Sequence, residues 1–186
     1  MLKYAFLTLA LVVGGLVALA LLPKSQRAVP DSTIALSDAS VTLFPQADPE
    51  AVWHFASPEV DYNPDARETV LHDVEDAERT VGSATDFTLQ AQEVTIDSDD
   101  NLRGEQIFVH LIEEAWDLDM QARDNRLVLI NQQQGLFEVP HLSWVGDGGE
   151  GINENMNISF DLTTFDSGGL GTVGKSVFDI GNADGE

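Results

Sequence analysis

Residues 87–111 read FTLQAQEVTIDSDDNLRGEQIFVHL. Apolar and polar residues alternate on both sides of an acidic turn, which is the pattern of two half-buried β-strands. The alternation changes phase after Ala91, because Val94 and Ile96 continue it one residue out of step. We therefore expect a β-bulge or bend near Glu93. The stretch predicts a β-hairpin, and it contains no nucleophile with a base, no metal-ligand spacing and no glycine-rich phosphate loop.

The same period of two recurs through most of the chain after Ala51. It is clear in QIFVHLI (106–112), WDLDMQA (116–122) and MNISFDLTTF (156–165), and turn signals separate these runs at short intervals. The stretch ARETVLHDVEDAERTVG (66–82) has the composition of a helix. Its apolar residues lack helical spacing, however, and its Thr and Val residues favour a strand. An all-β body is predicted.

A weak internal repeat predicts how these strands are arranged. Three segments share an apolar residue, an alanine (Ala56, Ala91 or Ala122), a β-rich run, a turn and another strand. A repeat of this size in β-structure predicts stacked hairpins rather than a compact sandwich. Small residues at a fixed point would let strands approach one another at a bend. Pro140 belongs on an edge or at a bulge, because it lacks a backbone N–H.

The N-terminal segment is apolar and long enough to cross a bilayer. About 20 apolar residues lead to Pro23, and this length just spans a membrane as a helix. A cleaved signal peptide is the alternative, since residues 18–20 have a small-x-small pattern. The apolar run continues through residue 22, which favours a retained anchor. The flanking basic residues do not settle the orientation.

Charge and composition narrow the function classes. All 32 acidic residues follow Arg27, whereas only six of the nine basic residues do, so this part has a net charge of about −26. Nucleic acid and anionic membrane surfaces would repel it. The chain contains no cysteine, which excludes disulfides, thiol catalysis and thiolate metal sites. High solubility is the simplest consequence of the acidity.

Four segments are expected along the chain. Residues 1–23 form a transmembrane anchor or signal peptide. Residues 24–48 form a polar linker that ends in a short strand at 41–44. Residues 49–165 form a single β domain, because about 160 residues after the N-terminal segment are enough for one sizeable core. Residues 166–186 form a flexible, glycine-rich acidic tail.

The hairpin at residues 87–111 resembles the repeat of the lipopolysaccharide-transport superfamily, the OstA-like proteins of the LptA and LptC type. The shared pattern is an apolar residue, Ala, then Val-x-Ile-Asp, a turn, Leu-x-Gly and a final Val-x-Leu. The resemblance covers roughly residues 50–145, and residues 146–186 have no counterpart in it. One N-terminal span followed by a β-body is most similar to the LptC-type component. The matching residues are Leu89, Ala91, Val94, Ile96, Asp97, Leu102, Gly104, Val109 and Leu111.

This resemblance implies a fold, a function and partners. The body is expected to be a folded-over β-jellyroll of stacked antiparallel hairpins, preceded by one N-terminal transmembrane helix. The protein is expected to be a single-pass inner-membrane protein with its β domain in the periplasm. It would receive lipopolysaccharide or a similar envelope lipid from an ABC exporter, and pass it to a periplasmic β-bridge protein by strand addition. The sequence does not identify the free edge strand, and residues 156–165, the last regular segment, are a candidate for the end that faces that partner.

An apolar inner face could shield acyl chains from water, and each buried methylene contributes roughly 0.8 kcal/mol. Lipid transfer therefore needs no catalytic group, and we expect no enzymatic activity, cofactor or metal. The alternative for each apolar residue is that it only fills a closed core. The lipid-groove candidates are the large apolar residues on alternating faces, namely Phe87, Leu89, Ile107, Val109, Leu111, Trp116, Leu118, Met120, Phe137, Val139 and Trp144.

Three other features have simple explanations. The four histidines are scattered, and His110 is expected to be packed or hydrogen-bonded rather than a ligand. Residues 97–101 resemble a calcium loop in composition only, because the glycine and the final Glu of an EF-hand are misplaced. Residues 146–151 are rich in glycine but lack the lysine of a nucleotide loop. A structural or tethering envelope protein without lipid transfer is the alternative function, and an enzyme is a distant third.

Overall fold

The computed structural model describes residues 33–146, 149–167 and 176–179, and the apolar N-terminal segment lies outside them. The described residues form β-strands and no helix, so the prediction of an all-β body is confirmed. In this part of the chain no helix is long and apolar enough to cross a membrane. The strands are β1 (Ile34–Leu43), β2 (Ala51–Asn63), β3 (Glu68–Val81), β4 (Ala84–Ile96), β5 (Leu102–Gly104), β6 (Gln106–Leu111), β7 (Trp116–Gln121), β8 (Val128–Asn131), β9 (Leu136–Gly146), β10 (Gly149–Ser159), β11 (Phe165–Ser167) and β12 (Ser176–Asp179).

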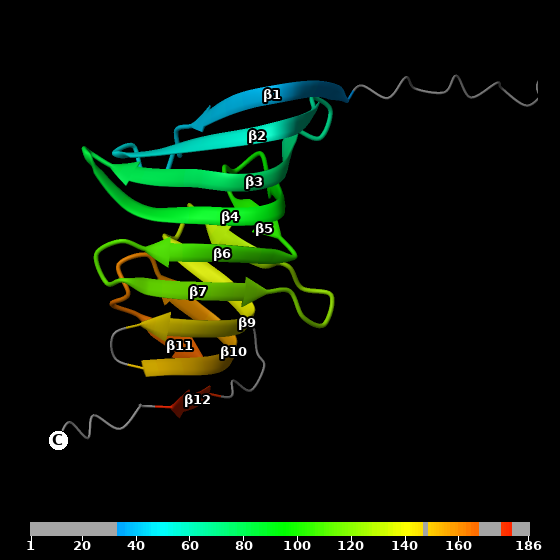
Figure 1. Ribbon diagram of the computed structural model, residues 1–186. Coiled ribbons are helices and arrows are strands. Elements are labelled where there is room, and N and C mark those ends of the chain that lie inside the picture. Colours follow the sequence, from blue (N-terminus) through cyan, green and yellow to red (C-terminus); the bar gives the residue numbers. More distant parts are fainter. Residues whose placement is uncertain (1–32, 147–148, 168–175, 180–186) are drawn as a thin grey trace, which may run out of the picture. The chain divides into compact units, whose positions relative to one another are not determined.

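The strands form one antiparallel sheet that divides in two at β4 and rejoins at β9. Strands β1 to β4 follow one another in sequence order (Figure 1). The first half of β4 bonds to β6, and its second half bonds to β5. One branch runs from β6 through β7 to the second half of β9. The other runs from β5 through β8 to the first half of β9. We call the two branches, with the strand halves that continue them, the β6–β7 layer and the β5–β8 layer.

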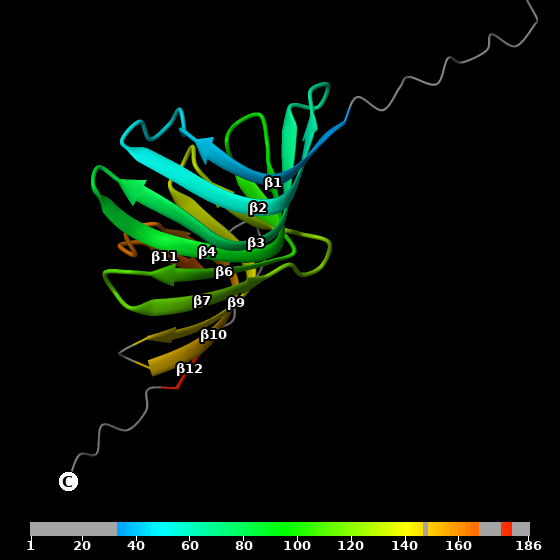
Figure 2. The ribbon, with the colours of Figure 1, turned by 45° about the horizontal axis from the view of Figure 1, so that its top comes forward.

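The long strands pass from one layer to the other where buried residues lie three positions apart instead of two. In β4, Ala91 and Val94 are both buried and Glu93 between them is exposed. Gly104 and Ile107 show the same spacing across the junction of β5 and β6. The predicted change of phase near Glu93 is therefore confirmed. Figure 2 shows the resulting curvature of β2, β3 and β4.

An extra residue in β3 accompanies this bend. The β3–β4 register shifts between Val74 and Ala77, and the β2–β3 register shifts beside it, so the bulge lies in β3. The sequence predicts a bulge or bend near Glu93, and β4 has the bend there without the extra residue. Asp73 and Asn155 have φ angles of 50° and 54° at the bend. Short polar side chains tolerate this left-handed conformation better than most. We call the bent line the crease; it comprises residues 57–60, 72–78, 91–94, 104–107 and 153–156.

Small residues and a proline meet different requirements at the crease. A Cβ added to Gly104 would lie 2.9 Å from a backbone oxygen of β4, so the close approach there needs glycine. Pro140 lies where β9 changes partner from β8 to β7, and its missing N–H costs no ladder bond at that point. Of the three repeated alanines, Ala91 is buried at the crease. Ala56 is exposed, and Ala122 follows the end of β7.

The hydrophobic core lies between the two layers. At its centre the rings of Trp53 and Phe55 stack with centroids 5.4 Å apart. Phe87 meets Trp53 and Phe137 edge-on, with centroids 5.3 Å apart in both pairs. Because Phe87 belongs to the β6–β7 layer and Phe137 to the β5–β8 layer, these contacts join the layers. Each aromatic pair adds about 0.5–1.5 kcal/mol beyond the burial of its surface.

The expected segment boundaries need correction at both ends. The predicted linker over residues 24–48 contains β1, a ten-residue strand paired along β2. Asp38, with a φ of 52°, interrupts the alternation within β1 and hides it from a search for a period of two. The predicted flexible tail, 166–186, contains β12, which pairs with β10. The remainder of that tail, apart from residues 166–167 of β11, lies outside the described residues.

Candidate functional site

An apolar cavity of about 360 Å³ opens at the end of the interior where β7, β9, β10 and β11 meet. Small-molecule sites in proteins usually have volumes of roughly 300–1,000 Å³. Several walls are only partly buried, and Phe165 is 49% exposed. The cavity therefore connects the interior of the sheet with solvent. Its lining residues are Trp116, Leu118, Leu142, Trp144, Asn153, Met156, Ile158, Phe165 and Ser167.

Two stacked tryptophans form one wall of this cavity. The ring centroids of Trp116 and Trp144 are 4.7 Å apart, and the ring planes differ by 9°. Trp144 donates its Nε1–H to Asn153 Oδ1 at 2.9 Å. A Cβ at Gly151 would lie 2.6 Å from Trp144 Nε1, and one at Gly146 would collide with Trp116. The two glycines therefore leave the space in which the rings lie.

The predicted lipid-groove residues all belong to the core or pack against it. Three of them, Trp116, Leu118 and Trp144, line the cavity. The cavity also uses Met156 and Phe165, which were not among the candidates. Met156 is recognisable from the alternation in residues 156–160, whereas nothing in the sequence indicates that Phe165 returns to the interior. The other eight candidates are buried in the closed part of the core, namely Phe87, Leu89, Ile107, Val109, Leu111, Met120, Phe137 and Val139.

A buried arginine lies in β3, directly after the crease residues of that strand. Arg79 faces inward from β3 and is 3% exposed. Its guanidinium forms ion pairs with Asp48 and Asp86, and it lies 4.8 Å from the centroid of Phe160 and 5.5 Å from that of Phe87. Sequence reasoning missed this residue. A simple alternation counted from residue 71 places it inward, but charged side chains are rarely buried.

The two carboxylates that pair with Arg79 are more exposed to solvent than the arginine. The side chains of Asp48 and Asp86 are 36% and 33% exposed, whereas that of Arg79 is 4% exposed. Burial raises the pKa of Asp86 above its usual value, although its contact with Arg79 acts in the opposite direction. Arg79 Nε and Trp53 Nε1 are buried without a hydrogen-bond acceptor in the described residues. Two donors in the core are thus left unsatisfied.

A row of inward residues connects Arg79 to the cavity. Arg79 pairs with Phe87 across β3 and β4, Phe87 with Leu111, and Leu111 with Trp116. Residues 160–165 comprise the turn after β10 and the first residue of β11, and they contact both ends of this row from the β5–β8 layer. The Phe160 ring contacts Arg79 and Phe87 at one end, and the Phe165 ring lies 6.2 Å from Trp116 at the other. We call residues 160–165 the covering segment.

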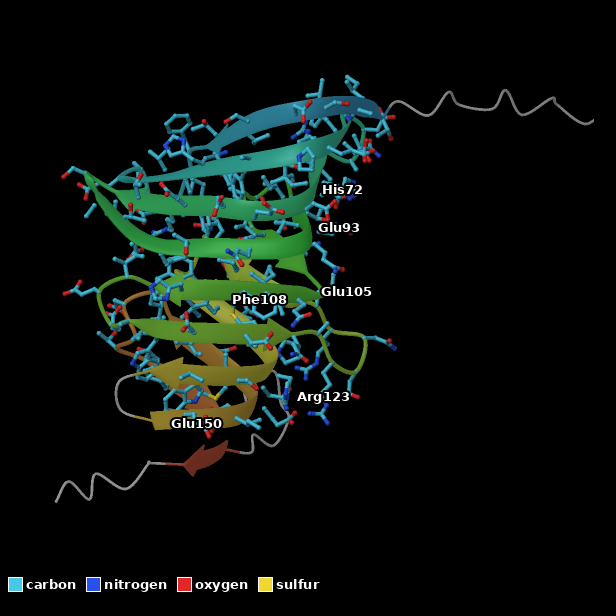
Figure 3. All side chains as sticks on the ribbon, in the orientation of Figure 1. His72, Glu93, Glu105, Phe108, Arg123 and Glu150 are labelled. Atoms are coloured by element: carbon cyan, nitrogen blue, oxygen red, sulfur yellow. The ribbon has the colours of Figure 1, made fainter. Side chains whose placement is uncertain are left out.

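The outer side of the crease is strongly acidic. Figure 3 shows His72, Glu93 and Glu105 following one another along one side of the strands. His72 lies 3.3 Å from Asp61 and 3.6 Å from Glu93. Within the described ranges, no group of three or more His, Cys, Asp or Glu side chains has the arrangement of a metal site. This surface is hydrated and charged, as the composition of the chain predicts.

The acidic turn between β4 and β5 is held by its own hydrogen bonds. Asp97 Oδ1 accepts the backbone N–H groups of Asp99 and Asn101 at 2.9 and 3.0 Å. Asp97 also pairs with Arg103. Burial alone would raise the pKa of Asp97, but these hydrogen bonds and the guanidinium outweigh it and lower the pKa below its usual value. The carboxylate that resembled a calcium ligand in the sequence stabilises the turn.

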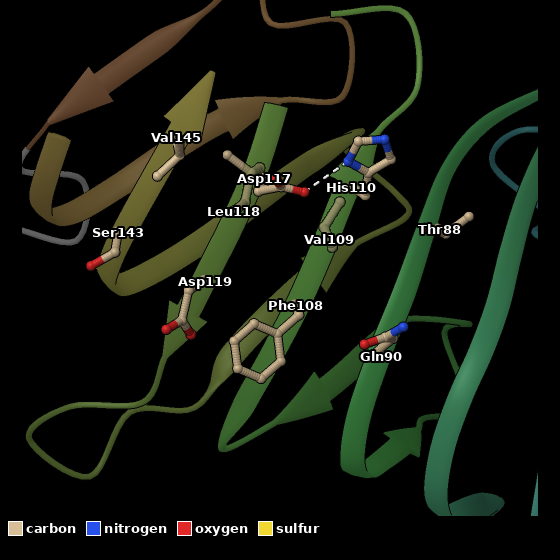
Figure 4. A pocket seen from close by; sticks show the side chains of 10 residues that line it. All are labelled: Thr88, Gln90, Phe108, Val109, His110, Asp117, Leu118, Asp119, Ser143 and Val145. Atoms are coloured by element: carbon tan, nitrogen blue, oxygen red, sulfur yellow. Dashed lines mark hydrogen bonds and ion pairs between the residues drawn. The ribbon is translucent and has the colours of Figure 1, made fainter. Parts of the chain in front are cut away.

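The outer face of the β6–β7 layer carries a shallow hollow (Figure 4). His110 and Asp117 face each other across β6 and β7, with Nδ1 and Oδ1 2.7 Å apart. The predicted hydrogen bond of His110 is thus present, although the side chain is exposed and not packed in the core. Phe108 and Val145 are exposed on the same face. Exposed ion pairs of this kind contribute little stability.

One end of the sheet presents an uncovered edge strand. In the described part of the chain β1 pairs only with β2. Ile34 and Leu36 in β1 are 51% and 48% exposed. At the other end β11 and β12 cover the two halves of β10. Residues 156–165, the segment that the sequence offers as the end facing a partner, lie at this other end, where β10 ends at Ser159 and β11 begins at Phe165.

Comparison with known proteins gives no assignment. No protein-family model matches the chain, and no curated protein is significantly similar to it. The geometry of the interior, the cavity and the edge strand is therefore the basis for a functional proposal.

Proposed function

We propose that this protein is a membrane-anchored lipid-transfer component of the cell envelope, similar to the LptC-type proteins of lipopolysaccharide transport. In this proposal the apolar N-terminal segment is retained in the inner membrane, and the β domain is a folded-over jellyroll in the periplasm. The protein receives lipopolysaccharide or a similar lipid from an ABC exporter. It passes the lipid to a periplasmic β-bridge protein and catalyses no reaction.

The apolar cavity at the end of the interior carries this proposal. Its walls continue the inward faces of the layers, so an acyl chain in the cavity would contact the same side chains that form the core. Trp116 and Phe165 are partly exposed at its mouth, where a chain would enter. Burial of about a dozen methylenes would contribute on the order of 10 kcal/mol before the costs of ordering the chain. Binding of this strength requires no catalytic or metal-ligating group.

The uncovered strand β1 supports the proposed assembly. A ten-residue edge with exposed apolar residues is a liability for a protein that works alone. A partner that adds a strand to β1 would satisfy the free backbone groups and cover Ile34 and Leu36. Because β1 is the first described strand after the proposed anchor, this edge suits a partner at the membrane. The opposite end of the sheet contains the cavity and suits the delivery of lipid.

Photo-crosslinking in cells tests this proposal. A photoreactive residue is placed at Leu118 in the cavity, at Leu89 in the closed core, and at Asp117 on the outer face of the same strand as Leu118. After irradiation of the full-length protein, adducts are identified by mass spectrometry. We expect a lipid adduct at Leu118 and none at Asp117. An adduct at Leu89 as well would mean that the layers separate during transfer.

The matched pair Leu118 and Asp117 makes the outcome decisive. The two residues are adjacent in β7 and face opposite sides of the layer. Equal labelling at both would indicate unspecific contact with membrane lipid. Absence of lipid at Leu118 and Leu89, in protein that is folded and exported, would refute lipid transfer.

The filled centre of the core favours one alternative, a structural or tethering envelope protein. Trp53, Phe55, Phe87 and Phe137 are at most 1% exposed and leave no continuous groove between the layers. A tether needs such a closed body and an edge for a partner, but it has no use for the cavity. Cross-linking through β1 to another protein, without lipid at Leu118, would support this alternative.

A further inference from the structure

Arg79 is the only arginine or lysine side chain buried in the described part of the chain. Removing an ion pair from water costs several kcal/mol per ion, and an apolar pair of similar volume is often as stable. Apolar residues in place of Arg79 and its two carboxylates would pack against Phe87 and Phe160 without that cost. The arrangement around Arg79 is therefore poorly explained by stability alone.

The local geometry gives Arg79 the properties of an anion-binding residue. Its guanidinium packs beside the rings of Phe87 and Phe160, which contact each other with centroids 5.7 Å apart. The carboxylates of Asp48 and Asp86 approach it from the solvent side and are about one-third exposed. The arginine is thus held by packing, while its anionic partners can turn into water. Arg79 Nε and Trp53 Nε1, which lie on directly paired residues, have no acceptor in the described residues.

We propose that Arg79 binds the anionic head group of an acyl lipid, with the head group taking the place of one internal carboxylate. The chemistry required is a phosphate or carboxylate joined to a long apolar chain. Such a head group supplies several acceptor oxygens, which can satisfy both the guanidinium and the unpartnered Nε–H. This inference rests on the proposed lipid-transfer function and specifies which class of lipid is carried.

The row between Arg79 and the cavity gives the acyl chain its path. From Arg79 in β3 to Trp116 in β7 the row crosses β4 and β6, so its ends are three strand spacings, or about 14 Å, apart. The covering segment contacts both ends of the row, with Phe160 at the arginine and Phe165 at the tryptophan. When this segment is displaced, a lipid can lie along the row, with its head group at Arg79 and the end of its acyl chain in the cavity.

Asp86 is the carboxylate that we expect the lipid head group to displace from Arg79. Burial already disfavours its charged form and raises its pKa. Release from Arg79 would let the side chain turn toward solvent or take up a proton. Asp48 lies in the turn between β1 and β2 and is the more exposed of the two. Both carboxylates therefore compete with an external anion, and removing either charge should strengthen lipid binding.

A binding comparison with three lipids tests the proposal. The full-length protein is kept in solution by an amphipathic polymer. It is titrated with three lipids that share a dibromostearoyl chain, namely the free fatty acid, the lysophosphatidate and the neutral monoacylglycerol. Bromine on the chain quenches the fluorescence of Trp53, Trp116 and Trp144 on contact. We expect both anionic lipids to bind at least tenfold more tightly than the neutral one. Stronger binding of the phosphate than of the carboxylate would identify a phospholipid-type head group as the ligand.

Two kinds of variant separate head-group recognition from stability. Arg79→Gln should abolish the tenfold preference and leave binding of the monoacylglycerol unchanged. Asp48→Asn keeps Arg79 in place and alters a partly exposed side chain, so it should fold even where Arg79→Gln does not. It should raise the affinity for the anionic lipids several-fold and leave the neutral lipid unaffected.

The outcomes distinguish this inference from the function on which it rests. Binding of all three lipids with equal affinity, or an unchanged preference in either variant, would overturn the role of Arg79 and leave lipid transfer intact. Failure of every lipid to quench tryptophan would overturn the lipid-transfer proposal itself.

Discussion

The interior of this protein is filled around Phe87 and hollow around Trp116, although both residues belong to the same inward row. Phe87 is fully buried and contacts aromatic rings from both layers. Trp116 is partly buried, and its main aromatic neighbour, Trp144, lies in its own layer. The filled region joins the two layers, whereas the hollow region leaves them apart with a cavity of about 360 Å³ between them.

The difference teaches that an inward-facing apolar residue has two possible roles in this fold. Near β2, β3 and β4 the side chains are large enough to meet across the interior, and they stabilise the body. Near β7, β9 and β10 the glycines at 146 and 151 leave room for stacked rings and a cavity. Stability and ligand contact are therefore expected to depend on different ends of one apolar face.

The largest expected effect comes from emptying the filled region. Phe87→Ala should lower the free energy of unfolding by about 3–5 kcal/mol, because it removes a buried ring and leaves a void between the layers. Trp116→Ala should cost only about 1–2 kcal/mol, since its ring is already partly in contact with water. Urea denaturation followed by circular dichroism measures both. Equal losses of unfolding free energy in the two variants would show that the filled and hollow regions form one core and do not differ in their contribution to stability.

A smaller effect is expected from filling the space beneath the tryptophan pair. In Gly151→Ala the new methyl group would lie 2.6 Å from Trp144 Nε1, so the ring must move. We expect a loss of about 1–3 kcal/mol, together with a change in the near-ultraviolet circular dichroism of the stacked indoles.

Gly82→Ala is the matched control for this variant. Gly82 has a φ of 63° and no atom within 4 Å of an added Cβ, so its substitution introduces backbone strain without a clash. It should cost about 1–2 kcal/mol and leave the tryptophan signal unchanged. An unaltered signal in Gly151→Ala would mean that the pair does not depend on the glycine.

Much of the fold could be predicted from alternation alone. The strands at 106–112 and 116–122 and the change of phase near Glu93 follow from a local period of two, and the strand nature of residues 66–82 follows from its Thr and Val residues and the lack of helical spacing. The bulge in β3 and the strand β1 could not be predicted in this way. Each contains a left-handed Asp, Asp73 or Asp38, which breaks the period that reveals a strand.

Less of the candidate site than of the fold could be predicted from the sequence. Alternation identifies which residues face inward, but it does not show where opposite layers meet and where they stay apart. Trp116 and Phe87 therefore looked equivalent in the sequence. Arg79 was missed because its burial depends on Asp48, 31 residues away, and on Phe160 from the other layer. Such long-range partners emerge only from the three-dimensional fold.

The smallest effect is expected at the acidic turn between β4 and β5. It tests whether this turn contributes to stability independently of the hollow region. The pKa of Asp97 in the folded protein lies below its ordinary value of 3.8. The carboxylate therefore stabilises the fold above pH 3.8, and this contribution is lost as the pH falls through the lowered pKa. Asp97→Asn should cost about 1 kcal/mol at neutral pH, and the difference from the parent protein should shrink below pH 3.8.

Urea denaturation of both proteins over a range of acidic pH measures this difference, and the many other carboxylates cancel in the comparison. Asp117→Asn provides a control, because Asp117 is 73% exposed and its pair with His110 should contribute less than about 1 kcal/mol. If the Asp97→Asn difference is the same at all pH values, the turn is held by its backbone geometry and not by the charge of Asp97. A pH-dependent difference that leaves the near-ultraviolet signal of the tryptophans unchanged would instead show that the turn and the hollow region respond separately, as the division of the interior predicts.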